Sequence, residues 1–143
     1  MNRFLRILFS GYLVLNLLLL TLCNKETTNQ PVDCSRCFPV PPDSGFLSVV
    51  LTINHENLKI PVKVYEGNLE DNHIKYVDTF THPNVRILMP AGHHYAVTAT
   101  YIRNNDTVIA VDGTTLEVKK AVGQCPKACY VVMGGYLDLQ LRK

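Results

Sequence analysis

The chain has 143 residues, the length of a single domain. Its formal net charge is +2, and two of its 14 basic side chains, Arg3 and Arg6, lie in the first 23 residues. The rest of the chain carries as many acidic as basic side chains, which excludes a protein that binds nucleic acid through excess positive charge. That part is also apolar enough to form a core, which excludes wholesale disorder.

Residues 1–23 have the layout of a secretion signal. Arg3 and Arg6 form a basic start, an apolar stretch runs from Ile7 to Leu22, and polar residues begin at Asn24. The apolar stretch is shorter than the ~20 residues that a membrane-spanning helix needs. We therefore predict a cleaved signal peptide, with an uncleaved short anchor as the alternative.

The leader ends in Leu20-Thr21-Leu22-Cys23, which resembles the lipobox of bacterial lipoproteins. The resemblance implies that the thiol of Cys23 is linked to diacylglycerol and that Cys23 becomes the new N-terminus. Leu22 departs from the Gly, Ala or Ser that this family prefers. Ordinary cleavage after Cys23 is the alternative, and it would leave the chain without a lipid anchor.

Residues 24–45 are predicted to form a tether before a domain at residues 46–143. The first ten are polar apart from Pro31 and Val32 and are typical of a flexible leash. Pro39, Pro41 and Pro42 follow, and they favour an extended, stiffer chain because proline fixes φ.

Four cysteines lie near the two ends of the exported chain, at Cys34, Cys37, Cys125 and Cys129. An even number in an exported chain indicates two disulfides, and joining the first pair to the second would close a loop of about 90 residues. A zinc site with all four cysteines as ligands is a second interpretation. A thiol oxidoreductase centred on Cys34 and Cys37 is a third, although the prolines that follow do not form the helix that such a motif opens.

From Phe46 onward, short runs of alternating apolar residues predict an all-β domain of seven or eight strands, an Ig-like or transthyretin-like sandwich. Pro61 predicts an edge strand or a bulge, and Asp112-Gly113 predicts a hairpin turn. Gly134-Gly135 predicts a bulge or a change of sheet. The residues expected to face the core are Leu47, Val49, Leu51, Ile53, Ile60, Val62, Val64, Val85, Ile87, Met89, Tyr95, Val97, Ala99, Tyr101, Leu137, Leu139 and Leu141.

Two segments resemble strands of transthyretin-like and carboxypeptidase-regulatory-like sandwiches. They are the proline-to-tyrosine run from Pro90 to Tyr101, and Val62-Lys-Val-Tyr-Glu-Gly67. Leader and sandwich together resemble small surface lipoproteins of Bacteroidetes-type bacteria. The resemblance implies a fold and a location, and it brings no catalytic residue with it.

The sequence shows no G-x-S-x-G elbow and no phosphate-binding glycine loop. We therefore expect a protein that is not an enzyme and that needs no cofactor or metal. His93 and His94 are adjacent and would point to opposite faces of a strand. Tyr65 shares the outward position of Lys63 and is the best candidate for an exposed aromatic side chain.

The expected function is that of a non-enzymatic cell-envelope lipoprotein at the outer membrane or the cell surface. Its β-sandwich would bind an unknown extracellular protein or glycan, or take part in surface assembly. Two alternatives stay open: a fimbrial or adhesion accessory subunit that offers or accepts a strand, and a zinc or thiol-redox protein that uses the four cysteines.

Overall fold

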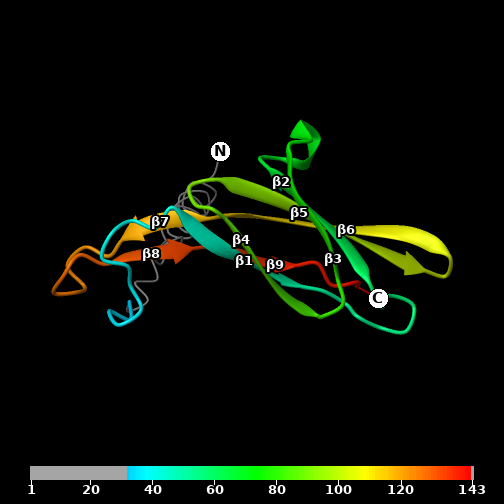
Figure 1. The fold of residues 1–143 in the computed structure, drawn as a ribbon, viewed down its shortest axis with the longest axis horizontal. Coiled ribbons are helices and arrows are strands. Elements are labelled where there is room, and N and C mark those ends of the chain that lie inside the picture. Colours follow the sequence, from blue (N-terminus) through cyan, green and yellow to red (C-terminus); the bar gives the residue numbers. More distant parts are fainter. Residues whose placement is uncertain (1–31, 143) are drawn as a thin grey trace, which may run out of the picture. The chain divides into compact units, whose positions relative to one another are not determined.

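A computed structural model describes residues 32–142, and the predicted leader lies outside these residues (Figure 1). The fold is all-β, as predicted. Its strands are β1 Ser44–Val50, β2 Ile60–Glu66, β3 Ile74–Phe80, β4 Asn84–Pro90, β5 His94–Arg103, β6 Asp106–Thr115, β7 Glu117–Lys120, β8 Tyr130–Met133 and β9 Tyr136–Asp138, and a single 3-10 turn, η2, spans Leu69–Asp71. Within the described part of the chain, no helix is long and apolar enough to cross a bilayer.

The strands form a sandwich of two sheets with a two-stranded ribbon at one end. One sheet has the order β4-β1-β9 and the other the order β3-β2-β5-β6 (Figure 1). Strands β7 and β8 form the ribbon, and neither pairs with another strand of the described residues. The pairing of β1 with β9 is parallel, whereas every other strand pair is antiparallel.

The core lies between the two sheets and follows the predicted alternation. Most of the expected residues are buried, and Ile53, Val85 and Leu141 are partly buried against the rest. Alternation produces this result because successive side chains of a strand point to opposite faces. Each fully buried large apolar side chain contributes about 1.5–3 kcal/mol to stability relative to an exposed one.

The buried polar groups in the core region are hydrogen-bonded. The hydroxyl of Tyr101 donates to the carbonyl of Leu139 at 2.8 Å and accepts from the backbone N–H of Thr52 at 3.1 Å. The side chain of Asn57 forms hydrogen bonds with both backbone groups of Ile102, at 2.8 and 2.9 Å. These bonds fix the loop after β1 and the C-terminal segment onto β5.

The expectation that Pro61 marks an edge strand is wrong. Strand β2 lies inside its sheet between β3 and β5. Pro61 is tolerated there because the pairing with β5 begins only at Val62, so the missing N–H falls outside that ladder. The register does shift in β2, but between Val64 and Tyr65 rather than at Pro61.

The prediction of a hairpin turn at Asp112-Gly113 is also wrong. Strand β6 runs without a break through both residues and pairs with β5 along its whole length. The Asp112 carboxylate forms its hydrogen bonds from within the strand and not in a turn. It accepts from the Gly113 N–H at 2.8 Å and from the Asp138 N–H at 2.8 Å. The true hairpin lies at Asn104 and Asn105, both of which have positive φ.

Gly134 and Gly135 separate two sheets, as the sequence predicted. They divide the last predicted strand into β8, which belongs to the ribbon, and β9, which pairs with β1. Both have positive φ, and a Cβ at Gly134 would lie 1.9 Å from the carbonyl oxygen of Thr115. This division explains why the described residues hold nine strands and not seven or eight.

Candidate functional site

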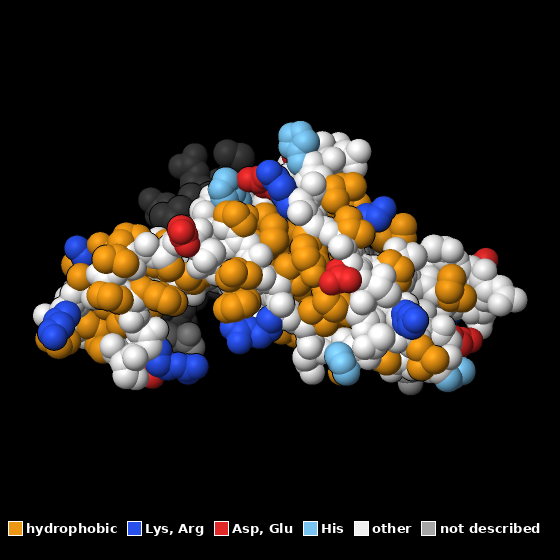
Figure 2. All heavy atoms as spheres, in the orientation of Figure 1, with side chains coloured by type: hydrophobic (Ala, Val, Ile, Leu, Met, Phe, Trp, Pro, Cys, Tyr) orange, Lys and Arg blue, Asp and Glu red, His pale blue; other side chains and the backbone are white. Residues whose placement is uncertain are grey.

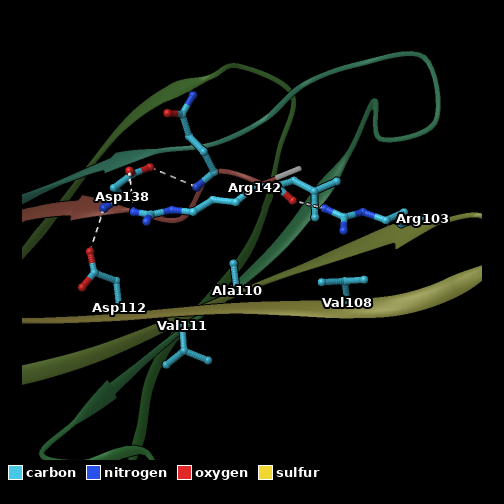
Figure 3. A pocket seen from close by; sticks show the side chains of 9 residues that line it. Arg103, Val108, Ala110, Val111, Asp112, Asp138 and Arg142 are labelled. Atoms are coloured by element: carbon cyan, nitrogen blue, oxygen red, sulfur yellow. Dashed lines mark hydrogen bonds and ion pairs between the residues drawn. The ribbon is translucent and has the colours of Figure 1, made fainter.

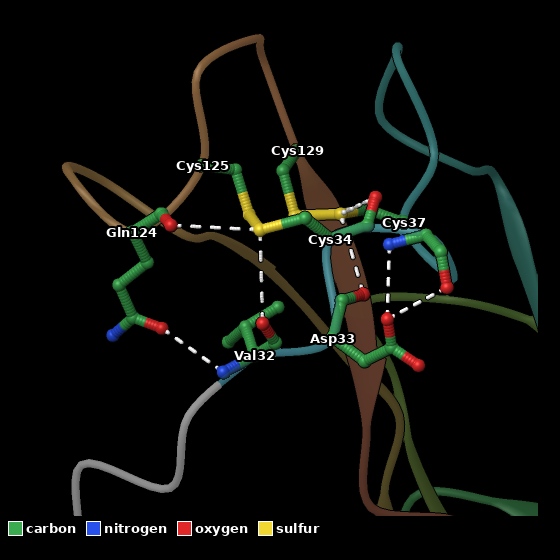
Figure 4. The surroundings of a disulfide bond; sticks show 8 residues. Val32, Asp33, Cys34, Cys37, Gln124, Cys125 and Cys129 are labelled. Carbon is green, nitrogen blue, oxygen red and sulfur yellow. Dashed lines mark hydrogen bonds between the residues drawn. A yellow bond between two sulfur atoms is a disulfide. The ribbon is translucent and has the colours of Figure 1, made fainter.

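Two disulfides join the N-terminal cysteine pair to the C-terminal pair (Figure 4). Cys34 is bonded to Cys125 and Cys37 to Cys129, with Cα–Cα distances of 5.7 and 5.1 Å. Each bond closes a loop of about 90 residues, with sequence separations of 91 and 92. This arrangement, which we call the clamp, is the first of the three interpretations of the cysteines.

Local hydrogen bonds hold the chain around Cys34 and Cys37 in a turn. The Asp33 carboxylate accepts from the Ser35 hydroxyl at 2.7 Å and from the Ser35 N–H at 3.0 Å, and the Arg36 N–H donates to the Asp33 carbonyl at 3.0 Å. The Ser35 hydroxyl is the main reason why the pKa of Asp33 lies below its ordinary value. A tight turn therefore holds Cys34 and Cys37 on the side that faces Cys125 and Cys129 (Figure 4).

The clamp is joined to the ribbon by backbone pairing as well. Phe38 and Tyr130 exchange two backbone hydrogen bonds of 2.9 Å each, which places the chain after Cys37 beside β8. The Ala121 N–H donates to the Cys129 carbonyl at 2.9 Å. Residues 32–38 are therefore part of the folded unit and not free tether.

The sulfur atoms of Cys37, Cys125 and Cys129 lie within 4.8 Å of one another. This proximity follows from the two disulfides themselves. A zinc ion binds thiolates, so its binding here would require both S–S bonds to be reduced first. In the described residues these cysteines form the one group of at least three His, Cys, Asp or Glu side chains with such spacing.

A hollow lies between the clamped end and the outer face of the β4-β1-β9 sheet. We call it the clamp groove, and its volume is about 680 Å³. Strands β1 and β4 provide one wall and β8 with the chain after Cys34 provides the other. The side chains that characterise it are Arg36, Phe38, Phe46, Arg86, Leu88 and Val132.

Two aromatic rings and two cations give the clamp groove its chemistry. Phe46 and Phe38 are about half exposed, at 44% and 48%. The Arg86 guanidinium carbon lies 4.0 Å from the centre of the Phe46 ring, a cation–π contact. Phe46 lies opposite Leu88 and Ser48 opposite Arg86, so antiparallel pairing places these side chains on one face. The arrangement suits a ligand with an apolar or ring-shaped part beside an anionic group.

Hydrophobic side chains also gather on the surface around this end of the molecule. Figure 2 shows them where Figure 1 places β7 and β8, and again over the middle of the face in view. Exposed examples near the clamp include Val40, Val122 and Met133. Exposed apolar patches of this kind are typical of surfaces that meet a partner.

Tyr65 is not the exposed aromatic residue that the sequence predicted. Its side chain is only 8% exposed, although its strand position does point it away from the core beside Lys63. Ala96 lies directly opposite in β5 and Gly113 follows in β6, and these small residues leave room for the ring close to the sheet. The exposed aromatic residues in the described part of the chain are instead Phe38, Phe46 and Tyr136. The sequence did offer a signal for Phe46: Leu47 was predicted to face the core, and the residue next to it in a strand points to the opposite face.

His93 and His94 have separate partners, and only His94 lies in a strand, at the start of β5. His93 Nδ1 lies 2.7 Å from the Glu66 carboxylate, which also contacts the Lys75 ammonium group at 2.6 Å. His94 Nδ1 lies 3.1 Å from the Thr115 hydroxyl. The hydrogen bond from Lys75 is the main reason why the pKa of Glu66 lies below its ordinary value of 4.5.

No family model, no curated protein and no solved structure matches this chain. Its class therefore rests on its own geometry: an all-β sandwich with a ribbon and two disulfides. Paired disulfides are typical of chains that fold in an oxidising compartment outside the cytoplasm.

Proposed function

We propose that this chain is a non-enzymatic lipoprotein of the bacterial cell envelope, a member of the small Bacteroidetes-type surface lipoproteins that it resembles. In this proposal Cys23 carries the lipid, and the β-sandwich binds an extracellular protein or glycan. The clamp is the observation that carries the proposal. It joins the chain directly after the predicted leash to Cys125 and Cys129. Arg36 and Phe38, which lie beside the cysteines of the first pair, line one side of the clamp groove.

The composition of the clamp groove supports binding rather than catalysis. Its lining among the described residues includes arginines, aromatic rings, serines and the carboxylate of Asp43, but no histidine and no cysteine. Ser44 and Ser48 therefore have no neighbouring imidazole in the groove that could act as a general base. The lining holds two arginines against one carboxylate, that of Asp43, so an excess of positive charge remains beside exposed apolar groups. This composition fits recognition of an anionic group on a partner.

Mass spectrometry of the native N-terminus tests the anchoring. The membrane fraction of exporting bacterial cells is expected to hold a chain that begins with Cys23 carrying a thioether-linked diacylglycerol. A Cys23→Ala variant is expected to lose the lipid and to move to the soluble fraction. A mature chain that begins at Asn24 would overturn the lipoprotein assignment.

Amide chemical shifts test the clamp groove. N-acetyl-Phe-Glu serves as a peptide probe and trigalacturonate as a glycan probe, and whichever binds is expected to shift the resonances of Phe46 and Arg86. An Arg86→Ala variant should lose these shifts. Arg142→Ala, which removes an exposed arginine from another part of the surface, serves as the matched control. If neither probe perturbs the groove, this surface is not the binding site.

A thiol titration of the unreduced protein, combined with a zinc assay, separates the proposal from the zinc and redox alternative. The proposal expects no titratable thiol and no bound zinc. Stoichiometric zinc, or cysteines that cycle between thiol and disulfide in cell extracts, would favour the alternative.

A fimbrial or adhesion accessory subunit is the second candidate, and one specific observation favours it. Among the described residues, no strand pairs with the outer edge of β6 in the larger sheet. Such an edge is where subunits of a surface fibre exchange strands.

A further inference from the structure

The two sheets have four outer strands, and three of them carry devices that hinder the addition of another strand. Strand β3 contains Lys75 beside a register shift. Strand β4 carries Arg86 and ends in Pro90, and β9 has only three residues. Charges, prolines, bulges and short length are the usual means by which edge strands are protected from pairing.

Strand β6 has fewer of these devices: its only charged residues, Asp106 and Asp112, flank the stretch from Thr107 to Val111. It is ten residues long, contains no Lys, Arg or Pro, and keeps an unbroken register with β5. Its sequence, Asp-Thr-Val-Ile-Ala-Val-Asp-Gly-Thr-Thr, is rich in β-branched residues. Ile109 and Val111 are more than half exposed on its outer face.

The ladder between β5 and β6 shows which backbone groups of β6 point outward. The Leu116 N–H donates to the His93 carbonyl, one step beyond the pair His94 and Thr115. In an antiparallel ladder, the backbone groups of successive residues point alternately to the two sides of a strand. Since Leu116 points toward β5, Thr114 and every second residue before it in β6 also point their N–H and C=O groups toward β5. The intervening residues Thr107, Ile109 and Val111 therefore direct their N–H and C=O groups away from the sheet.

A groove of about 490 Å³ follows this edge, between β6 and the C-terminal segment (Figure 3). Val108, Ala110 and Leu141 line it, and all three are partly buried hydrophobic residues that pack against the core. The groove therefore exposes the margin of the core beside a row of free backbone groups. Those groups repeat every two residues, or about 6.7 Å, a spacing that another extended backbone matches.

Charges mark one end of this groove. The Asp112 carboxylate accepts from the Asp138 N–H, and the Asp138 carboxylate lies 3.4 Å from the Arg142 guanidinium group (Figure 3). Two carboxylates and one guanidinium leave a net negative charge there. At the other end, the Arg103 guanidinium donates to the carbonyl of Arg142.

We propose that the free edge of β6 from Thr107 to Val111 accepts an extended, antiparallel segment of a partner polypeptide. The segment carries apolar β-branched side chains toward Val108 and Ala110 and a basic side chain near its start, opposite Asp112. A second copy of β6 fits less well, because self-pairing would bring Asp106 and Asp112 of both copies together without a cation in either strand. This inference rests on the second candidate function, but it does not depend on the acylation of Cys23.

A blocked heptapeptide, Thr-Lys-Thr-Val-Thr-Val-Thr, is the probe for the oxidised protein. In the proposed register its lysine lies opposite Asp112 and its valines lie opposite Ala110 and Val108. Fluorescence anisotropy is expected to show binding, and amide shifts are expected at Thr107, Ile109 and Val111. Replacing the lysine of the peptide with glutamate should weaken binding several-fold because the charge then matches that of Asp112 and Asp138.

N-methylation of the peptide provides the sharpest control. Peptide residues opposite Ile109 and Val111 point their N–H groups at β6, and these are threonines in the probe. Methylating them should weaken binding by about tenfold or more, the equivalent of one lost hydrogen bond of about 1.4 kcal/mol. Methylating the valines, whose N–H groups point away from β6, should leave binding nearly unchanged.

An Ile109→Pro variant tests the same point from the protein side. The Ile109 N–H points away from β5, so proline removes a free donor and leaves the ladder intact. The variant should keep its far-ultraviolet circular dichroism and lose the peptide. Equal binding of both methylated peptides would overturn the proposal, and so would unchanged binding by a folded variant. A dimer of the unmodified protein that the proline disperses would also overturn it, because β6 would then serve self-association.

Discussion

The sandwich and the clamped end of this protein are stabilised by different means. In the sandwich, β2 and β5 each bury at least three side chains and β1 buries two, and Leu47, Val62 and Val97 are fully enclosed. At the clamped end, which comprises β7, β8 and residues 32–43 and 121–129, neither strand has a buried residue. A segment that buries so little apolar surface needs covalent cross-links to stay folded.

The size of the covalent contribution follows from the loops that the disulfides close. A loop of about 90 residues corresponds to about 4–5 kcal/mol in the chain-entropy model. The two disulfides run side by side, between Cys34 and Cys125 and between Cys37 and Cys129. The second therefore restricts a chain that the first has already closed, and it contributes less than the first.

Removing both cross-links is expected to have the largest effect. A chain with all four cysteines replaced by serine should lose about 5 kcal/mol or more of unfolding free energy, measured by urea denaturation. Hydrogen exchange should show that residues 117–133 lose protection first while β2 and β5 keep it. The matched control, Cys37→Ser with Cys129→Ser, keeps one disulfide and should lose about half as much or less. Equal loss of protection in both regions would contradict the division of the molecule described above.

The next largest effect is expected at the junction between the two regions. Gly134→Ala places a Cβ against the Thr115 carbonyl at a residue with φ of +84°, so we expect a loss of about 3 kcal/mol. Gly92→Ala is the matched control, because φ there is +87° and the space is open. It should cost only about 1 kcal/mol. Thermal unfolding of the two variants measures the difference, and equal costs would show that steric contact at Gly134 is unimportant.

A smaller effect is expected inside the sandwich. Tyr101→Phe removes the hydroxyl that bridges the Thr52 N–H and the Leu139 carbonyl, and it leaves both groups without that partner. The expected loss is about 1–3 kcal/mol, measured by urea denaturation. Tyr136→Phe removes an exposed hydroxyl and should be nearly neutral. If Tyr101→Phe leaves the free energy of unfolding unchanged, water replaces the hydroxyl in the variant.

The smallest effect is expected for the exposed ion pair of Glu66 and Lys75. Because Lys75 holds the pKa of Glu66 below 4.5, the carboxylate stabilises the fold above that pH. This stabilisation is lost as the pH falls below 4.5 through the lower pKa of the folded state. Glu66→Gln should therefore flatten the pH dependence of the unfolding midpoint below pH 4.5. Glu70→Gln, at a residue without an ion pair in the described structure, should leave that dependence unchanged.

Alternation of apolar residues was sufficient to predict the fold class and most of the core. It works because the period of two is a local property of each strand. Gly134 and Gly135 were also informative, since only glycine fits there. Asp112 and Gly113 misled, because the same dipeptide that forms a turn can lie within a strand when its carboxylate finds nearby backbone donors.

The candidate sites were less accessible to sequence reasoning. Alternation places Phe46 and Arg86 on outward faces, but their contact depends on the register between β1 and β4. The free edge of β6 depends on strand order, which is set by contacts between residues far apart in the sequence. The cysteine spacing pointed to the clamp, yet it could not say which cysteine bonds to which.

The two disulfides also determine how mechanical tension passes through the molecule. A pull between a point upstream of Val32 and the far end of the chain reaches Cys34 and crosses a sulfur–sulfur bond to Cys125, or continues to Cys37 and crosses to Cys129. It then runs along β8 and β9 only. Strands β1 to β7 lie outside this route, so a load of this kind cannot unravel them until a covalent bond breaks.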